Sequence, residues 1–270
     1  MEWNKGAFDR LILTESKKEL VQALVIAHVA GENTHDIIEG KGNGLIMLLH
    51  GGPGTGKTLT AESVAELAEK PLYRVGCGDI GTDAESLERY LDSVLFIGTT
   101  WGCVVLLDEA DVFLEERIQT DMQRNAVVSV FIRVLEYYDG ILILTSNRVG
   151  TFDEAFKSRV QIALHYPALD DYGRRRIWND FLSSAFDSED DPHYRLVKSQ
   201  LDMLIHYDLN GRQIRNIVNT AKQLAQFKQQ ALSLKHFEQA ATAVVEFEDY
   251  IKNTHGYSDE EVAKAQGTRF

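Results

Sequence analysis

A glycine-rich segment at residues 51–58, GGPGTGKT, has the residue types and spacing of a phosphate-binding loop. It fits the pattern G-x-x-x-x-G-K-[ST], in which glycines let consecutive backbone N–H groups turn inward around a phosphate. The Lys57 ammonium would reach the β- and γ-phosphates, and the Thr58 hydroxyl would coordinate Mg²⁺. A Gly-rich turn that matches by chance is the alternative. The predicted nucleotide contacts are Gly51, Gly52, Pro53, Gly54, Thr55, Gly56, Lys57, Thr58 and Leu59.

Two acids end the apolar run of VVLLDEAD, at residues 104–111. A strand here would place Asp108 and Glu109 at the carboxyl edge of a sheet, where ligands bind in open α/β proteins. We expect Asp108 to hold the Mg²⁺ through water and Glu109 to polarise the attacking water. Acids at a strand end are often only solvated. At this distance from a phosphate-binding loop, however, they predict hydrolysis of a Mg-bound nucleotide.

An asparagine follows a further apolar run in LTSNRV, at residues 144–149. A neutral amide at this point, Asn147, can orient water against a γ-phosphate. The alternative is an asparagine that only forms a turn.

Apolar runs that alternate with helical periodicity must position these groups. Strands are predicted at 45–50, 72–77, 103–108, 141–146 and 160–166, with helices at 17–30, 58–69, 84–97 and 122–137 between or before them. In the first helix we expect Leu20, Leu24 and Ala27 to share the buried face. Strands that alternate with helices imply an α/β fold with a doubly wound, mostly parallel, five-stranded sheet.

The strand signals stop after Pro167, and helical spacing continues at 171–185, 212–228 and 235–250. We therefore predict two domains, a nucleotide-binding α/β subdomain at 1–168 and an all-helical lid at 169–270. The acidic stretch at 183–193 is predicted to be a surface loop.

These motifs, in this order, resemble those of a AAA+ ATPase module, nearer to the AAA subfamily. The resemblance runs from about Phe8 to about Tyr250. The segment EGKGNGLIMLLHGGPGTGKTLTAE is most similar in sequence to a group of fungal AAA proteins of unclear role. In that group the module usually lies towards the end of a longer chain, so this sequence is expected to be a fragment. The resemblance implies ATP as the nucleotide and assembly into a homo-oligomeric ring such as a hexamer.

The resemblance also implies two arginines that would sense the phosphates. FDEAFKSRV, at 152–160, matches the region that carries the family's arginine finger. Arg159 would reach the γ-phosphate held by a neighbouring subunit; a surface ion pair with Asp153 or Glu154 is the alternative. LNGRQIRN, at 209–216, resembles the family's second sensor. There Gly211 would allow close approach to the nucleotide and Arg212 would touch the γ-phosphate.

One part of the sequence departs from the family's threading members. Those members carry an aromatic residue in the loop after the second strand, where it grips an extended peptide. The corresponding segment, 76–86, offers Ile80 and Gly81 without an aromatic side chain. Processive threading of a protein substrate is therefore not the expectation.

The composition restricts the setting of the protein. A net charge of -13 argues against a nucleic-acid partner. Two cysteines, Cys77 and Cys103, cannot form a disulfide framework, and no run is long and apolar enough for a signal peptide or a membrane span. These features predict a protein of a reducing compartment, the cytoplasm or the nucleus, that is not secreted.

Three functions fit the residues. The first is an oligomeric Mg·ATP hydrolase that remodels a protein partner. The second is a nucleotide-gated assembly scaffold with slow hydrolysis. The third, a clamp-loader-like ATPase that works on nucleic acid, gains from Ser158–Arg159 and loses from the net charge.

Overall fold

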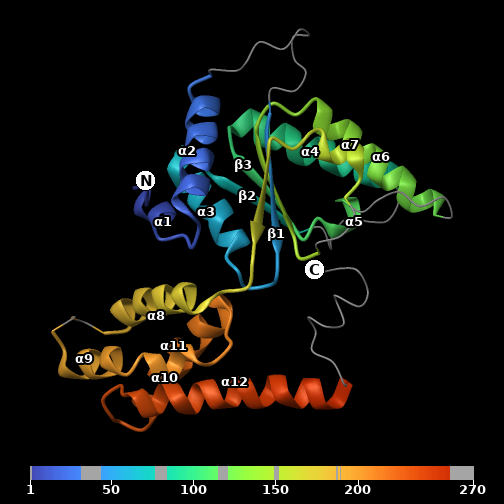
Figure 1. Cartoon of the computed structure of the whole chain (residues 1–270). Coiled ribbons are helices and arrows are strands. Elements are labelled where there is room, and N and C mark those ends of the chain that lie inside the picture. Colours follow the sequence, from blue (N-terminus) through green and yellow to red (C-terminus); the bar gives the residue numbers. More distant parts are fainter. Residues whose placement is uncertain are drawn as a thin grey trace. The chain divides into compact units, whose positions relative to one another are not determined.

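The structure is a computed structural model that describes residues 2–31, 44–76, 84–114, 121–148, 152–186, 188 and 190–255 (Figure 1). It divides into two compact units. The α/β unit consists of Met1–Gly51 and Gly56–Tyr166, and the helical unit consists of Gly52–Thr55 and Pro167–Phe270.

A five-stranded parallel sheet forms the centre of the α/β unit. Its order is β2-β3-β4-β1-β5, and every neighbouring pair is parallel. The strands are β1 (Leu45–Gly51), β2 (Leu72–Gly76), β3 (Val104–Asp108), β4 (Ile141–Ser146) and β5 (Ile162–Tyr166). The predicted fold class is therefore confirmed, and each strand boundary differs from the expected one by two residues at most.

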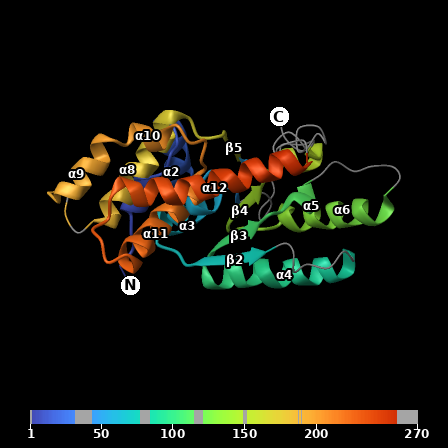
Figure 2. The same cartoon turned by 90° about the horizontal axis from the view of Figure 1, so that it is seen from below.

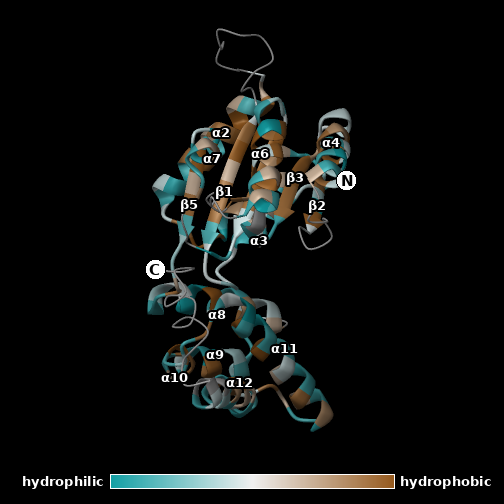
Figure 3. Cartoon of the chain, turned by 90° about the vertical axis from the view of Figure 1, so that its right-hand side faces the viewer, coloured by the Kyte–Doolittle hydropathy of each residue, from teal (hydrophilic) through white to brown (hydrophobic). Residues whose placement is uncertain are grey.

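Both faces of the sheet are covered by helices, which explains why its central strands read as continuous apolar runs. In Figure 1, α2 and α3 lie on one side of the strands and α4 and α6 on the other. Alternate residues of each strand enter the two cores. Leu48 and Leu107 pack towards α4 and α6, whereas Met47 and Leu106 pack towards α2 and α3. In Figure 3 the strands β1 and β3 are mostly in the brown of hydrophobic residues.

The helices of the α/β unit include three short ones that the sequence analysis did not predict. Within its described residues the helices are α1 (Gly6–Asp9), α2 (Glu15–Val29), α3 (Lys57–Ala68), α4 (Ala84–Trp101), α5 (Asp111–Leu114), α6 (Met122–Glu136) and α7 (Glu154–Lys157). The expected face of α2 was wrong in part, because Leu20 is 49% exposed while Val21 and Val25 are buried.

The helical unit has a core of its own. Its helices are α8 (Asp171–Ala185), α9 (Pro192–Ser199), α10 (Asp202–Ile205), α11 (Gly211–Phe227) and α12 (Leu234–His255). Trp178 of α8 and Phe237 of α12 are fully buried and meet edge to face, with ring centroids 6.1 Å apart. Figure 2 shows α11 alongside α12, and the two are in contact. The predicted loop at 183–193 was wrong at both ends, because α8 continues to Ala185 and Pro192 opens α9 with Asp191 as its cap.

No helix within the described ranges is both long enough and apolar enough to span a bilayer.

Candidate functional site

The end of β1 can hold only a glycine at position 51. Gly51 has a φ of +146°, and a Cβ atom built on it would lie 2.1 Å from the backbone oxygen of Tyr166 on the adjacent strand. Gly56 has a φ of +103° and is the N-cap of α3. The backbone on both sides of the loop therefore adopts conformations that favour glycine, as a phosphate cradle requires.

We expect Gly51→Ala to lower the free energy of unfolding by at least about 2 kcal/mol, because the new methyl group would strike a strand backbone that cannot move aside. Gly52→Ala is the matched control, since a Cβ there meets nothing nearer than 3.8 Å. Urea denaturation of the two variants measures the difference. Equal stabilities would show that β1 and β5 do not approach as closely as described.

Lys57 lies folded onto the loop that it belongs to. It opens α3, is only 6% exposed, and its Nζ donates a hydrogen bond to the backbone oxygen of Gly51 at 2.9 Å. Thr58 is half-buried and Leu59 is 52% exposed. The first turn of α3 starts from a glycine, which has no side chain to cap it. This helix N-terminus suits a phosphate, and a lysine ammonium is already at its edge.

Asp108 is held on both sides by neighbouring strands. Its Oδ2 accepts from Arg74 Nη2 of β2 at 2.5 Å, and its Oδ1 accepts from Thr145 Oγ1 of β4 at 2.5 Å. Asp108 is 9% exposed, whereas Glu109 is exposed. A buried carboxylate beside an exposed one is the donor set that a hydrated Mg²⁺ and a catalytic water need, so these residues fit the predicted roles.

Glu109 has an unusual backbone for a non-glycine residue, with a φ of +60°. Left-handed conformations of such residues are held by surrounding contacts and occur often at functional sites. Here the Glu109 amide donates to Thr145 Oγ1 at 3.0 Å, and the Ala110 amide donates to the Thr145 backbone oxygen at 2.9 Å.

Asn147 directly follows β4, where the sequence placed it, and is half-buried. The turn that carries it is fixed from both sides. The hydroxyl of the preceding Ser146 donates to Asp111 Oδ1, and the amide of the following Arg148 donates to the same oxygen at 3.3 Å. The position of Asn147 is thus tied to the turn after β3.

Arg159 is held within its own unit by an acid that the sequence did not suggest. Its Nη2 pairs with Glu136 Oε2 of α6 at 2.9 Å, and its Nη1 donates to the Ala155 backbone oxygen at 2.6 Å. The side chains of Arg159 and Glu136 are 23% and 24% exposed. The expected alternative partners were Asp153 and Glu154. Asp153 instead caps α7 by accepting from the amide of Ala155.

His50 directly precedes the loop, and its pKa lies below that of a solvated histidine. Burial is the main cause of its lowered pKa, and nearby His165, Lys17 and Lys57 lower it further. Its ring lies 5.1 Å from that of His165, the residue opposite it on β5. His50 therefore stays neutral over a wider pH range than a solvated histidine, which limits positive charge beside Lys57.

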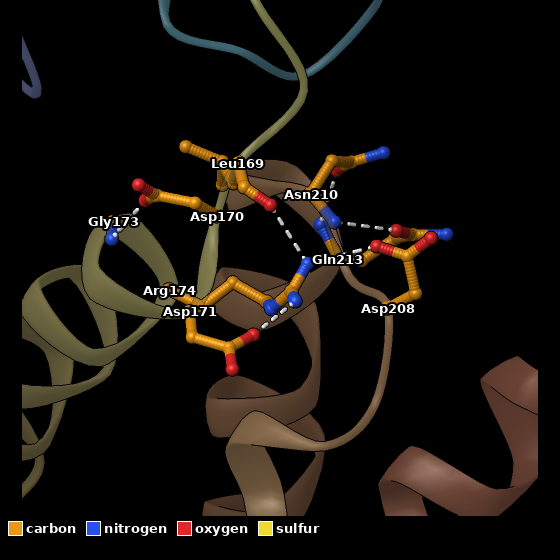
Figure 4. Close-up of polar contacts among 8 residues, drawn as sticks. All are labelled: Leu169, Asp170, Asp171, Gly173, Arg174, Asp208, Asn210 and Gln213. Carbon is orange, nitrogen blue, oxygen red and sulfur yellow. Dashed lines mark hydrogen bonds and ion pairs between the residues drawn. The ribbon is translucent and has the colours of Figure 1, made fainter.

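In the helical unit, Asn210 and Gln213 form a capping box at the start of α11. Asn210 Oδ1 accepts from the Gln213 amide at 2.9 Å, and Gln213 Oε1 accepts from the Asn210 amide at 2.8 Å (Figure 4). The Gly211 amide donates to the backbone oxygen of Gly54 at 3.0 Å, and a Cβ on Gly54 would meet Asn210 Oδ1 at 2.4 Å. Arg212 is exposed.

An arginine of α8 fixes the turn that leads to this capping box. Figure 4 shows the Arg174 guanidinium between Leu169, Asp171 and Asp208. It donates to the backbone oxygen of Leu169 at 2.8 Å, to Asp171 at 2.6 Å and to Asp208 at 2.8 Å. Asp208 lies two residues before Asn210, so Arg174 helps to place the start of α11.

Some predicted features lie outside the described residues. These are Cys77 and the pair Ile80–Gly81 of the loop after β2. Cys103 is described, and it is buried as a free thiol.

The sequence analysis missed Arg74, Thr145 and Arg174. For Thr145 a signal existed, since it is a polar residue inside the otherwise apolar run ILILTS. Arg74 stands beside buried Val75 on an edge strand, and such an arginine is usually only solvated.

Two sequence models of protein families match adjacent parts of the chain. Residues 47–168 match AAA, described as the ATPase family associated with various cellular activities, and residues 169–258 match the fungal AAA+ ATPase lid domain.

Several curated proteins are similar over part of the chain. A putative 26S proteasome regulatory subunit homolog of Methanothermobacter thermautotrophicus is 29% identical over 182 residues, 64% of this chain and 47% of that protein. The ATP-dependent zinc metalloprotease YME1 homolog of Caenorhabditis elegans is 27% identical over 189 residues, 65% of this chain and 25% of that protein. The chain thus spans less than half the length of these relatives.

Among solved structures, the AAA domain of FIGL-1 in complex with ADP is similar in fold. Its TM-score is 0.63 at 18% identity, and the match covers 93% of this chain and 90% of that one.

Proposed function

The chain belongs to the AAA family of ATPases and carries a lid of the fungal AAA+ type, and we propose that it binds Mg·ATP and hydrolyses it in an oligomeric ring to remodel a protein partner. One observation carries the proposal. The three central strands β3, β4 and β1 are parallel neighbours, and at the same edge they end in Asp108–Glu109, Asn147 and the glycine loop with Lys57.

Each of these residues has a role set by its place. Lys57 and the first-turn amides of α3, which include Thr58, bind the phosphates. When bound, Mg²⁺ would offset the negative charge that develops on the phosphates during hydrolysis. Asp108 and the Thr58 hydroxyl hold that ion, Glu109 polarises the attacking water, and Asn147 orients it. In the helical unit, Gly211 and Arg212 would respond to the γ-phosphate.

A shared active site is the further part of the proposal. Arg159 would leave Glu136 and reach the γ-phosphate bound by a neighbouring subunit, where its charge stabilises the transition state. Because the exchange replaces one anionic partner by another, the guanidinium need not lose its ion pair. The protein partner is unidentified, and the net charge of -13 favours protein over nucleic acid. A reducing compartment agrees with the free thiol of Cys103.

We expect phosphate release per subunit to rise with protein concentration, and Arg159→Ala to lower it at least about 100-fold while ATP still binds. Arg133→Ala is the matched control, since Arg133 also pairs with an acid of its own unit, Glu88, at 2.5 Å. Turnover that is slow and independent of concentration, and unchanged in Arg159→Ala, would contradict the shared site. That result would favour a nucleotide-gated scaffold.

A further inference from the structure

Thr145 makes contact with three consecutive residues of the acidic turn after β3. Its hydroxyl donates to Asp108 Oδ1 at 2.5 Å and accepts from the Glu109 amide at 3.0 Å. Its backbone oxygen accepts from the Ala110 amide at 2.9 Å. The side chain that should hold the metal and the backbone that carries the water-polarising acid are therefore bonded to one residue of the next strand.

The register of the sheet makes these contacts possible. β3 and β4 are parallel neighbours with Leu107 opposite Leu144, so Thr145 is the first residue of β4 beyond the last paired position of β3. Thr145 is 2% exposed, and its β-branched side chain has few rotamers. A hydroxyl held this way can donate one bond and accept another at the same time, which neither valine nor alanine can do.

The two bonds of the hydroxyl act on different properties of the site. The bond to Oδ1 fixes the rotation of the Asp108 carboxylate. The second oxygen, Oδ2, then faces Arg74, with which it is paired. The bond from the Glu109 amide supports a backbone with a φ of +60°, which is unfavourable for a glutamate without such support.

We propose that Thr145 is the positioning residue of this site, which sets the metal-holding orientation of Asp108 and the placement of Glu109 through one hydroxyl group. The inference rests on the proposed function, since it assigns Thr145 a part in holding Mg²⁺ and in directing water. Thr145 would act through Asp108 and Glu109, the residues that its hydroxyl contacts.

The test measures Mg²⁺ binding without turnover. All variants carry Glu109→Gln, and the affinity for a fluorescent ATP analogue is measured as Mg²⁺ is raised. The Mg²⁺ half-point is the Mg²⁺ concentration that gives half of the full rise in analogue affinity. We expect Thr145→Val to raise this half-point at least about fivefold, because a hydrogen bond to the buried carboxylate of Asp108 is lost. Thr145→Ser keeps the hydroxyl and should stay within about twofold of the parent. If the valine variant does not fold, Thr145→Ala is compared with Thr145→Ser instead.

A second measurement separates positioning from a merely structural role. With Glu109 intact and Mg²⁺ saturating, Thr145→Val should lower kcat more than it raises KM, since the placement of Glu109 matters after binding.

Ser63→Ala is the control for the Mg²⁺ titration. It removes another buried hydroxyl, one that donates to the Leu59 backbone oxygen within α3, and it should leave the Mg²⁺ half-point unchanged.

The outcomes distinguish this inference from the function on which it rests. If the parent Glu109→Gln protein binds the analogue equally well with and without Mg²⁺, the proposed function fails. If the parent depends on Mg²⁺ and folded Thr145→Val has the same half-point, the positioning role of Thr145 is overturned. A shift in the valine variant that serine does not restore would also overturn it, because the hydroxyl would then not be the cause.

Discussion

Replacing Lys57 by methionine should abolish ATP binding, with an affinity at least about 100-fold weaker than that of the unchanged protein. Lys57 is the cation at the start of α3, and its ammonium already lies at the loop, 2.9 Å from the Gly51 backbone oxygen. Methionine keeps a long apolar stem, so the loss is confined mainly to the charge and its hydrogen bonds. Calorimetric titration with ATP measures the effect.

Two controls make this result interpretable. Lys5→Met changes a lysine that is 63% exposed and paired with Glu69, and it should leave ATP binding unchanged. Thermal unfolding of Lys57→Met without nucleotide shows whether the loop still folds once its own lysine contact is gone. ATP affinity that is unchanged in a folded Lys57→Met protein would refute the phosphate-binding role of the loop.

Replacing Glu109 by glutamine should stop hydrolysis while ATP remains bound. Glutamine keeps the size of the side chain but cannot accept a proton from water or draw it towards the phosphate, so turnover should fall at least about 100-fold. Asp108 and its contacts with Arg74 and Thr145 are not altered by the change. Phosphate release and retention of labelled ATP after gel filtration measure the two effects.

The matched change is Glu154→Gln, which alters an exposed acid in the first turn of α7. It should hydrolyse ATP as the unchanged protein does. If Glu109→Gln also turns over at the unchanged rate, another group must polarise the water. The exposed position and left-handed backbone of Glu109 would then need a different explanation.

The strands and the groups at their ends could be predicted because they depend on local sequence. A continuous apolar run such as ILILTS can be buried on both faces, and parallel strands bring their carboxyl ends to one edge. Asp108, Glu109 and Asn147 each follow such a run directly. Their shared location therefore required only the correct fold class, which alternating strands and helices indicated.

The buried face of α2 could not be read from periodicity alone. Leu20 and Leu24 have the correct spacing, but Val21 and Val25 have it as well, one residue further along. Which stripe is buried depends on how α2 meets α3 and the sheet, and the structure selects Val21 and Val25. The short helices α1, α5 and α7 have only four residues each, too few to show a period.

The contacts that hold the candidate site are tertiary, and no local pattern specifies them. Arg74 and Asp108 are 34 residues apart, Thr145 and Asp108 are 37 apart, and Arg159 and Glu136 are 23 apart. Each pair depends on the order and register of strands or on the packing of α6 against the segment after α7. The sequence pointed to Asp108 and Arg159 as site residues but not to the residues that orient them.

We propose that each active site combines Glu109 of one subunit with Arg159 of the next. The direct test is to mix equal amounts of Glu109→Gln and Arg159→Ala proteins, each nearly inactive alone, and to measure phosphate release. With random assembly, about a quarter of the interfaces join an intact Glu109 to an intact Arg159. The mixture should therefore hydrolyse ATP far faster than the sum of its components. A mixture no faster than that sum, in proteins that assemble as the active unchanged protein does, would contradict the claim.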